Sequence, residues 1–496
     1  MYGVISLLIG QLQAWSAGLT CVVAVIVTGA ALVVTWGGWA SGRRVDVPGP
    51  PWLLGFGPLM SFARFIWMGV PVAAAHYGER YGDFVRVWIA GERTYVITRP
   101  SAAWHVLKSN NYCRRFGSRT GLNTIGMYQN GIIWNGDDGW KVLRGFFQKA
   151  LNADTLNRAT AAAVDATYRQ MGNIAALQRK TADGKIEALD FLRRITLEVT
   201  NNLTLGVHIA DPDDLVERIV RYFKAWEFFL LRPPVLYLMT PRLYWKHCQA
   251  VKDLNEAIAD LLSKKREELK TEPPSDKPDF TTCLLQAEER GEVSPAHVQQ
   301  CVLEMLLAGT DTSSVSMYYL LVSVAENPQV ELQVLEEMRD ILGERDPTKA
   351  DLPQLVYLEQ VIKEAMRVKP VGPVIMRQAM EDDRVDGIET PAGTNIILNL
   401  ADMHRRQENF PAPDDFNPQH FHNKEFKGEY VPFGTGPKGC IGQFLAMIEM
   451  KAIMCTLLRR YHLRAIPGES LEGIKTHWDI AQQPVDASYM YFEERN

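Results

Sequence analysis

The chain has 496 residues, of which 47% are hydrophobic and 22% are charged, with 53 basic and 58 acidic residues and a net charge of −5. This composition excludes a disordered chain, and the near balance of charge argues against nucleic acid as a partner. The seven cysteines are odd in number and lack paired spacing, which argues against a disulfide framework or a structural zinc site. The length allows several domains or one large enzyme domain.

The first 42 residues contain no charged side chain, and Arg43 and Arg44 carry the first charges. Residues 17–36 are almost all apolar or small, and as a helix they would be roughly 30 Å long, the thickness of a bilayer core. A cleaved signal peptide is the alternative, but the segment lacks a basic start. The sequence therefore predicts a membrane anchor over residues 1–47, with a transmembrane helix at about 17–36 and residues 48–496 on the cytosolic side.

The remaining residues predict a mainly α-helical body with a small β part. Strand-like runs occur at 84–89, 94–97 and 394–399, whereas the periodicity from about 140 to 344 is helical. The prolines of Val47 to Pro51 predict a stiff strap between anchor and body, and the polar stretch Lys270 to Lys277 predicts a surface loop. No repeat or long linker divides the chain, so one domain is expected.

One predicted helix is unusually long and apolar. Ser294 is a suitable N-cap, Pro295 fits the first turn, and the next proline is Pro328. Its middle, Ala308 to Ser314, contains a glycine, an acid and several hydroxyls, and predicts a kink or an opened turn. A satisfied core helix is the alternative, but a buried acid is costly without a partner, which favours a functional role.

A second motif is the glycine-rich loop from Phe433 to Gly442, which leads into a helical run at 443–460. Cys440 would sit at the start of that helix, where amides and the helix dipole are expected to lower its thiol pKa and favour the thiolate, the form that binds metals. The loop also satisfies G-x-G-x-x-G, but no βαβ unit surrounds it, which argues against a nucleotide site.

The pattern F-x-x-G-x-K-x-C-x-G, with Phe433, Gly436 and Cys440, resembles the haem-ligand loop of the cytochrome P450 superfamily. Three further segments fit this family in order and spacing. Glu364 and Arg367 are similar to its E-x-x-R pair, Ala308 to Ser313 to its oxygen-activating segment, and Trp140 and Arg144 to its W-x-x-x-R. The resemblance implies the cytochrome P450 fold, haem b (iron protoporphyrin IX) as cofactor, and Cys440 as the axial ligand of the haem iron. Where the family often completes a triad with arginine, this chain has His420, for which a weaker hydrogen bond is expected.

From about Pro48 to Pro484 the chain resembles the aromatase (oestrogen synthase) branch, as in the stretches Arg115 to Ser118, Gln300 to Leu306 and Ile375 to Asp383. The resemblance implies that the haem propionates are held by Arg115, Trp140, Arg144, Arg377 and Lys438. It makes Asp311 and Thr312 catalytic, with Asp311 also donating a hydrogen bond to the 3-keto end of a steroid and the amide of Met376 meeting the 17-oxygen. The implied substrate contacts are Ile133, Trp134, Phe223, Trp226, Ala308, Asp311, Thr312, Val374, Ile375, Met376 and Ile480.

Several positions depart from the aromatase pattern, which suggests a divergent or early-branching member. Gly309 and Thr310 replace an alanine and a proline, Trp134 replaces a phenylalanine, and Pro373 and Gln483 stand at positions that are usually acidic and histidine. The missing proline removes one cause of the helix displacement that makes room for a steroid.

The resemblance implies a monooxygenase that converts androgens (androstenedione, testosterone) to oestrogens by three successive oxidations of the angular methyl, with dioxygen and NADPH-derived electrons. Its implied partners are membrane lipid and NADPH-cytochrome P450 reductase, docking on the cysteine side near Lys141, Lys149 and Lys438, in the endoplasmic reticulum membrane. The alternatives are a steroid or other lipid hydroxylase that does not aromatise, a haem-thiolate isomerase or dehydratase, and a non-enzymatic haem sensor or lipid-binding protein.

Overall fold

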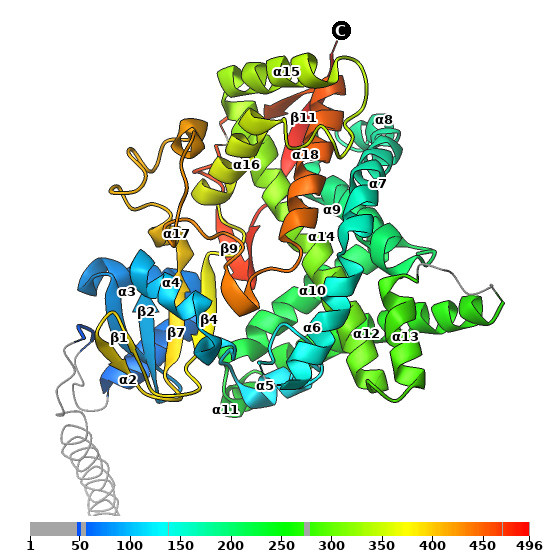
Figure 1. Cartoon of the computed structure of the whole chain (residues 1–496). Helices are drawn as coiled ribbons and strands as arrows, with labels where there is room; N and C mark the ends of the chain where they lie inside the picture. The colour runs from blue at the N-terminus through cyan, green and yellow to red at the C-terminus, as the bar shows by residue number, and fades with distance from the viewer. Residues whose placement is uncertain (1–46, 51–55, 137, 272–277, 469, 496) are drawn as a thin grey trace, which may run out of the picture.

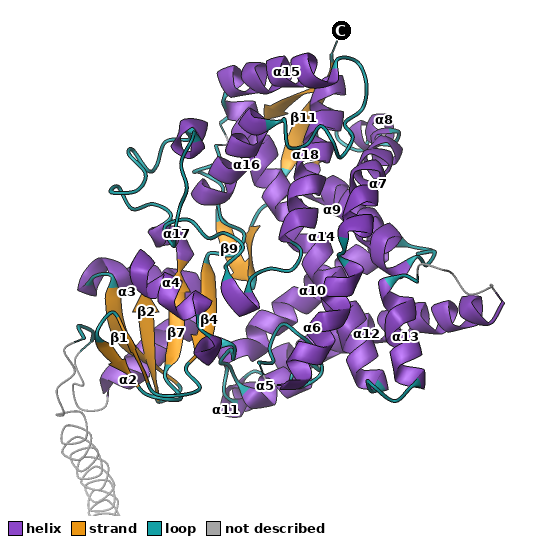
Figure 2. Cartoon of the chain, viewed as in Figure 1, coloured by secondary structure: helices purple, strands orange, loops and turns teal. Residues whose placement is uncertain are grey.

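The computed structural model describes residues 47–50, 56–136, 138–271, 278–468 and 470–495. Helices dominate these residues and strands form small sheets (Figure 2), which confirms the predicted mainly α architecture. The predicted transmembrane helix at about 17–36 lies outside the described residues, as does most of the predicted loop at 270–277. Among the helices that are described, none is long and apolar enough to span a membrane.

The four-stranded sheet lies at one side of the molecule (Figure 1) and joins segments that are distant in sequence. Its order is β1 (Phe84–Ile89), β2 (Glu92–Ile97), β7 (Asn395–Asn399) and β4 (Val374–Gln378), and β2 runs parallel to β7. The helices α2 (Phe56–Met68) and α3 (Val70–Tyr81) pack against it. The proline strap reaches the same sheet, because the Arg86 amide donates to the Pro48 carbonyl at 2.8 Å.

In the part of the chain that the structure describes, seven further strands form three smaller antiparallel sheets. These are β10 (Ala481–Pro484) with β9 (Thr476–Asp479); β3 (Ile186–Glu187), β11 (Tyr489–Glu494) and β8 (Tyr461–Ala465); and β5 (Asp383–Val385) with β6 (Ile388–Thr390).

The other helices build the larger part of the body. They are α4 (Pro100–Lys108), α5 (Arg119–Thr124), α6 (Asp138–Ala150), α7 (Ala153–Met171), α8 (Ile174–Gln178), α9 (Ala188–Thr200), α10 (Pro212–Leu231), α11 (Pro234–Met239), α12 (Pro241–Thr271), α13 (Phe280–Glu289), α14 (Pro295–Glu326), α15 (Pro328–Leu342), α16 (Val356–Val368), α17 (Leu400–Met403) and α18 (Gln443–Arg460). Short 3-10 turns occur at Asn110–Tyr112, Pro418–Phe421 and Gly436–Lys438, and a π turn at Asn201–Leu205.

The central helix α14 has the predicted start, with Ser294 as N-cap and Pro295 in its first turn, and its 32 residues end at Glu326, just before Pro328. It runs without interruption through Gly309, so the predicted opened turn does not form. The physical reason is that hydroxyls satisfy carbonyls within the helix instead of opening it: Thr312 Oγ1 donates to the Ala308 carbonyl at 2.5 Å, and Ser316 Oγ to the Thr312 carbonyl at 2.8 Å. The polar segment 308–314 separates two large apolar clusters, of which one contains the apolar residues of 298–307 and the other those of 315–324.

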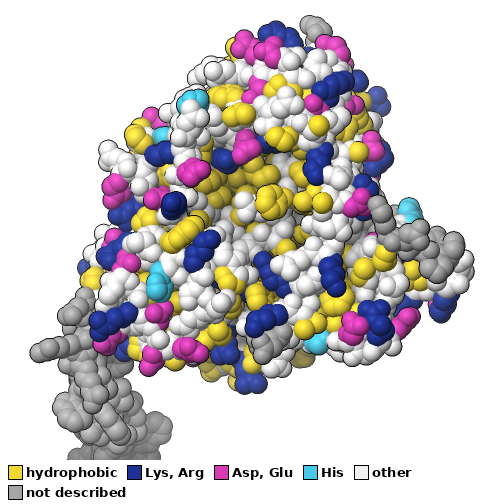
Figure 3. All heavy atoms as spheres, in the orientation of Figure 1, with side chains coloured by type: hydrophobic (Ala, Val, Ile, Leu, Met, Phe, Trp, Pro, Cys, Tyr) yellow, Lys and Arg dark blue, Asp and Glu magenta, His cyan; other side chains and the backbone are white. Residues whose placement is uncertain are grey.

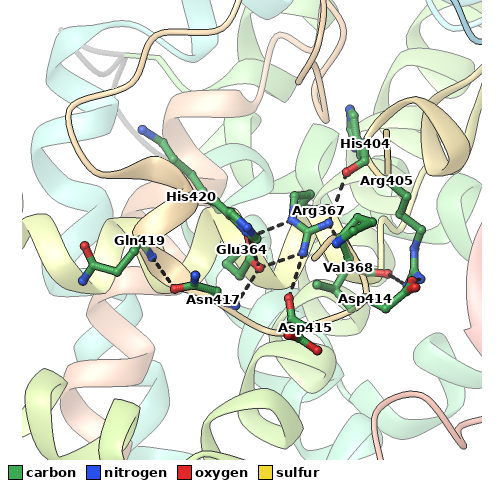
Figure 4. A network of polar contacts seen from close by, with 12 residues as sticks. Glu364, Arg367, Val368, His404, Arg405, Asp414, Asp415, Asn417, Gln419 and His420 are labelled. Atoms are coloured by element: carbon green, nitrogen blue, oxygen red, sulfur yellow. Dashed lines mark hydrogen bonds and ion pairs between the residues drawn. The ribbon is translucent and has the colours of Figure 1, made fainter. Parts of the chain in front are cut away.

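A buried polar network holds α16 against the chain that precedes the cysteine loop (Figure 4). The Arg367 guanidinium donates to both Glu364 oxygens at 2.8 Å, and both side chains are fully buried. The Nδ1 atom of His420 lies 3.1 Å from Glu364 Oε1, so the hydrogen bond expected of His420 is present. Arg367 also donates to the carbonyls of Pro413 and Asp415, which ties the network to the backbone on the other side.

Candidate active site

An internal cavity of about 370 Å³ lies between α14 and the cysteine loop. It is lined by the middle of α14, by β4, by the loop from Pro432 to Gly442 and by the first turns of α18. Five of the six predicted cofactor-binding residues line it, namely Arg115, Arg144, Arg377, Lys438 and Cys440. The sixth, Trp140, contacts two of these residues, because its ring centroid lies 4.5 Å from Lys438 Nζ and 5.5 Å from Arg144 Cζ.

The accessible part of the Cys440 side chain opens into this cavity, and the surrounding protein encloses the rest of the residue. Its amide donates to the Phe433 carbonyl at 2.9 Å, which closes the loop, and Gly436 has a positive φ of 70° at a point where a Cβ would meet the Leu107 carbonyl. The expectation of a lowered thiol pKa was wrong for the protein chain alone. The amides of Gly442 and Gln443 and two arginines do lower the pKa of Cys440, but burial outweighs them and raises it.

Cationic groups gather at one edge of the cavity. Burial lowers the pKa of Arg115 and of Arg377, and burial together with these two arginines lowers that of Lys438 to about 6. Arg115 Nε has no hydrogen-bond partner among the described residues. Buried cations held together are stabilised by anions, so this edge fits the two propionates of a haem, for which guanidinium forks are well suited.

Lys438 itself faces inward. Its Nζ atom donates to the carbonyls of Ile132, at 2.8 Å, and of Asn135, and the side chain is buried. The expectation that Lys438 lies where the reductase docks was therefore wrong, because the side chain is buried, whereas Lys141 and Lys149 are exposed on α6.

Eight of the eleven predicted substrate-binding residues line the cavity: Ile133, Phe223, Trp226, Ala308, Thr312, Val374, Ile375 and Ile480. Ile480 occupies the tip of the β9–β10 hairpin with a φ of 66°, a strained value for a β-branched residue that is typical of functional positions. Trp134, Met376 and Asp311 do not line the cavity. The Trp134 ring packs against Gly117, and the Met376 side chain is buried while its carbonyl accepts from Arg377 Nη1 at 2.9 Å.

Asp311 faces away from the cavity, into a buried polar group between α14, α9 and β10. Its Oδ1 accepts from Arg193 Nε at 3.0 Å and its Oδ2 accepts from Gln483 Nε2. Burial raises the pKa of Asp311 more than Arg193 and Gln483 lower it, but both carboxyl oxygens serve as acceptors here. Because Asp311 does not line the cavity and both of its oxygens already accept hydrogen bonds, it is not placed to donate a hydrogen bond to a ligand in the cavity.

Sequence reasoning missed Arg193, Glu304 and Glu449. Glu304 lines the cavity and accepts from the amides of Ile132, at 2.7 Å, and Ile133, at 3.1 Å. Glu449 lines the cavity from α18. The available signal was an ionisable residue at an apolar position of a helix, since Glu449 stands within the run Leu445 to Leu458.

Comparisons with known proteins agree with this geometry. The cytochrome P450 family model matches residues 47–490. The aromatase of Oryctolagus cuniculus is 42% identical over 463 residues, covering 92% of this chain and 91% of that protein, and that of Homo sapiens is 39% identical over 467 residues, covering 94% and 91%. A solved zebra fish cytochrome P450 with abiraterone superposes with a TM-score of 0.72 at 20% identity, covering 84% of this chain and 97% of that chain.

The helical body, with a cysteine presented by a loop to an internal cavity, defines a haem-thiolate monooxygenase, and the chain belongs to the cytochrome P450 family. Within that family it belongs with the aromatases, because aromatases about 40% identical to it match over at least nine-tenths of its length. Its cofactor is haem b.

Proposed function

We propose that this enzyme converts androgens such as androstenedione and testosterone to oestrogens by three successive oxidations of the angular methyl group. The observation that carries the proposal is the cavity itself, whose walls beside Cys440 are mainly apolar and fit a flat, apolar polycyclic substrate. Its relatives are called aromatases, which supports the same reaction.

Haem b, when bound, supplies the dioxygen chemistry, and the protein supplies binding and orientation. We propose Cys440 as the ligand of its iron and the cationic edge with Arg115, Arg144, Arg377 and Lys438 as the holder of its propionates. The apolar walls exclude water, and Thr312 presents a hydroxyl side chain to the cavity from α14.

A neutral donor in the cavity wall supports recognition of an oxygen on the substrate. The indole Nε1 of Trp226 is buried and has no hydrogen-bond partner among the described residues, and the side chain lines the cavity. A keto oxygen would satisfy this group. We therefore assign to Trp226 a contact that the resemblance gives to Asp311.

The reductase is proposed to dock on the cysteine side. A groove of about 940 Å³ lies there, and Pro432, Phe433 and Gly434 line both this groove and the internal cavity. Figure 3 shows apolar side chains gathered in a hollow of this face, with lysine and arginine side chains around it. The groove includes Phe444, which is 70% exposed, and the exposed lysines Lys349, Lys424 and Lys427, which suit a partner with acidic groups.

Membrane attachment through residues 1–47, with the body of residues 48–496 at the cytosolic face of the endoplasmic reticulum, completes the proposal. It rests on the charge-free stretch before Arg43 and on the lipid solubility of steroids.

Reconstitution with the reductase and NADPH tests the proposed reaction. Androstenedione is expected to yield oestrone and an equal amount of formate. A second candidate, a steroid hydroxylase that stops after one oxygen insertion, is favoured by the engagement of both Asp311 oxygens. Accumulation of a hydroxylated steroid without oestrone or formate would identify that second activity instead.

A further inference from the structure

Two arginines of the four-stranded sheet lie on one face of β1 and β2. Val85 and Val87 of β1 belong to the apolar cluster that includes residues of α2 and α3. Because side chains alternate along a strand, Arg86 and Trp88 point to the opposite face of the sheet. Arg93 of β2 stands directly opposite Trp88 in the antiparallel register, and the Arg86 Cζ atom lies 4.9 Å from the centroid of the Trp88 ring. The two arginines therefore flank one indole ring.

The positive charge on this face is not compensated by acids of the neighbouring strands. The carboxyl of Glu389 is paired with an arginine of β5 at 3.1 Å, and that of Glu92 accepts from Asn395 Nδ2 at 2.8 Å. In the described part of the chain neither Arg86 nor Arg93 forms an ion pair, and the buried Nε of Arg86 has no hydrogen-bond partner. Burial and the charge of Arg93 lower the pKa of Arg86. Two guanidinium groups held in this way favour a shared anion.

The proline strap lies on the same face of the sheet as the two arginines. Val47 belongs with Tyr95 to one apolar cluster, and the Arg86 amide donates to the Pro48 carbonyl at 2.8 Å. Arg44, which the positive-inside rule assigns to the membrane surface, is three residues before Val47, or roughly 10 Å of fully extended chain. The arginine face is therefore within reach of lipid headgroups, a region that tryptophan side chains also favour.

We propose that Arg86 and Arg93 bind the phosphate of an anionic phospholipid headgroup at the membrane surface. The inference rests on the proposed membrane attachment through residues 1–47. A guanidinium fork matches two phosphate oxygens, so the pair holds one phosphate between its two forks. The uncompensated charge favours an anionic headgroup over phosphatidylcholine, whose choline group is positive. The contact fixes the sheet beside the strap and so limits rotation of the body about it.

The test titrates full-length holoenzyme in neutral detergent micelles with phosphatidylserine or phosphatidylcholine and counts the bound lipids by native mass spectrometry. The wild type is expected to bind phosphatidylserine about 10-fold more tightly than phosphatidylcholine, and Arg86→Gln and Arg93→Gln are each expected to weaken phosphatidylserine binding by about 5-fold. Arg339→Gln is the matched control and should bind as the wild type does, because Arg339 is largely exposed and its helix α15 lies at the far end of the molecule from β1 (Figure 1).

A conservative variant separates the guanidinium fork from the charge. Arg93→Lys keeps the charge without the fork, so its affinity for phosphatidylserine is expected to lie between those of the wild type and Arg93→Gln. The haem absorption spectrum checks that each variant is folded. Equal affinity of the wild type for the two lipids, or equal losses in Arg93→Gln and Arg339→Gln, would overturn the proposal.

Soluble anions distinguish a lipid site from a general phosphate site. Inorganic phosphate and glycerophosphoserine are expected not to displace phosphatidylserine at a concentration equal to that of the lipid. Displacement at equal concentration would assign the arginines to a soluble phosphate and overturn the lipid proposal. The titration in micelles does not depend on the anchor, whereas extraction of the full chain from membranes by alkaline carbonate would contradict the anchor alone.

Discussion

Arg193 of α9 and Asp311 of α14 form an ion pair in which the Nε and Oδ1 atoms lie 3.0 Å apart and neither side chain is more than 9% exposed. Gln483 of β10 bonds to both partners, so the pair joins three elements that are far apart in sequence. It also directs the only acid of the segment 308–314 away from the cavity.

Removal of one partner of this pair is expected to be costly, because it leaves the other charge buried. Arg193→Met should lower the free energy of unfolding by about 3–5 kcal/mol, measured by urea denaturation. The neighbouring Arg194 is the control, since its partner Asp213 is largely exposed, and Arg194→Met should cost about 0–1 kcal/mol. Equal losses in the two variants would contradict the assignment of a buried pair.

Gly309 and Thr200 are expected to be coupled. A Cβ at Gly309 would lie 2.5 Å from Thr200 Oγ1, so Gly309→Ala should destabilise the protein by about 1–3 kcal/mol despite the better helix propensity of alanine. In a Thr200→Ala background the same substitution should stabilise it by about 1 kcal/mol. A double-mutant cycle by urea denaturation measures the sign of the stability change that Gly309→Ala causes in each background. Additive effects would show that a side chain at position 309 does not clash with Thr200.

His420 is expected to contribute to stability through Glu364. His420→Ala removes the contact with Glu364 and that with the Pro411 carbonyl at 2.8 Å, and should cost about 1–3 kcal/mol in urea denaturation. The nearby His422 is exposed, and His422→Ala should stay within about 0.5 kcal/mol of the wild type. If His420→Ala leaves the free energy of unfolding unchanged, then Arg367 is sufficient to stabilise the buried carboxylate of Glu364 without His420.

The pH dependence of the free energy of unfolding should show that the pKa of Glu449 is raised in the folded protein. Its pKa is raised to about 8 in the folded protein from 4.5, so the folded state holds one more proton than the unfolded state between these values. Stability from this group is full below about pH 4.5, falls as the pH rises toward 8 and is constant above it. Glu449→Gln should therefore flatten the decline in the free energy of unfolding between pH 5 and 8, measured by urea denaturation at each pH, by an amount of the order of a few kcal/mol. An unchanged slope would show that Glu449 ionises normally.

Much of the fold was predictable because local signals agree with the tertiary structure. The cap at Ser294 and the proline at 295 predict the start of α14, and the strand-like runs at 84–89 and 94–97 predict β1 and β2. The Cys440 loop was predictable because glycine and proline positions define it locally.

The site was only partly predictable, because its remaining parts depend on contacts across the fold. The direction of Asp311 is decided by Arg193 and Gln483, which lie 118 and 172 residues away, and no local pattern contains that information. The role of Lys438 was misjudged for the same reason, since the carbonyls of Ile132 and Asn135 draw it inward. The uninterrupted α14 shows that hydroxyls at helical positions can satisfy carbonyls within the helix instead of breaking it.

The spectrum of the reduced carbonyl complex tests most directly whether Cys440 binds haem in this cavity. The wild-type holoenzyme should show the red-shifted absorption that a thiolate ligand produces, and Cys440→Ser should lose it. Cys283→Ser, a control on α13 outside the cavity, should keep the wild-type spectrum. A wild-type spectrum in Cys440→Ser would contradict the account.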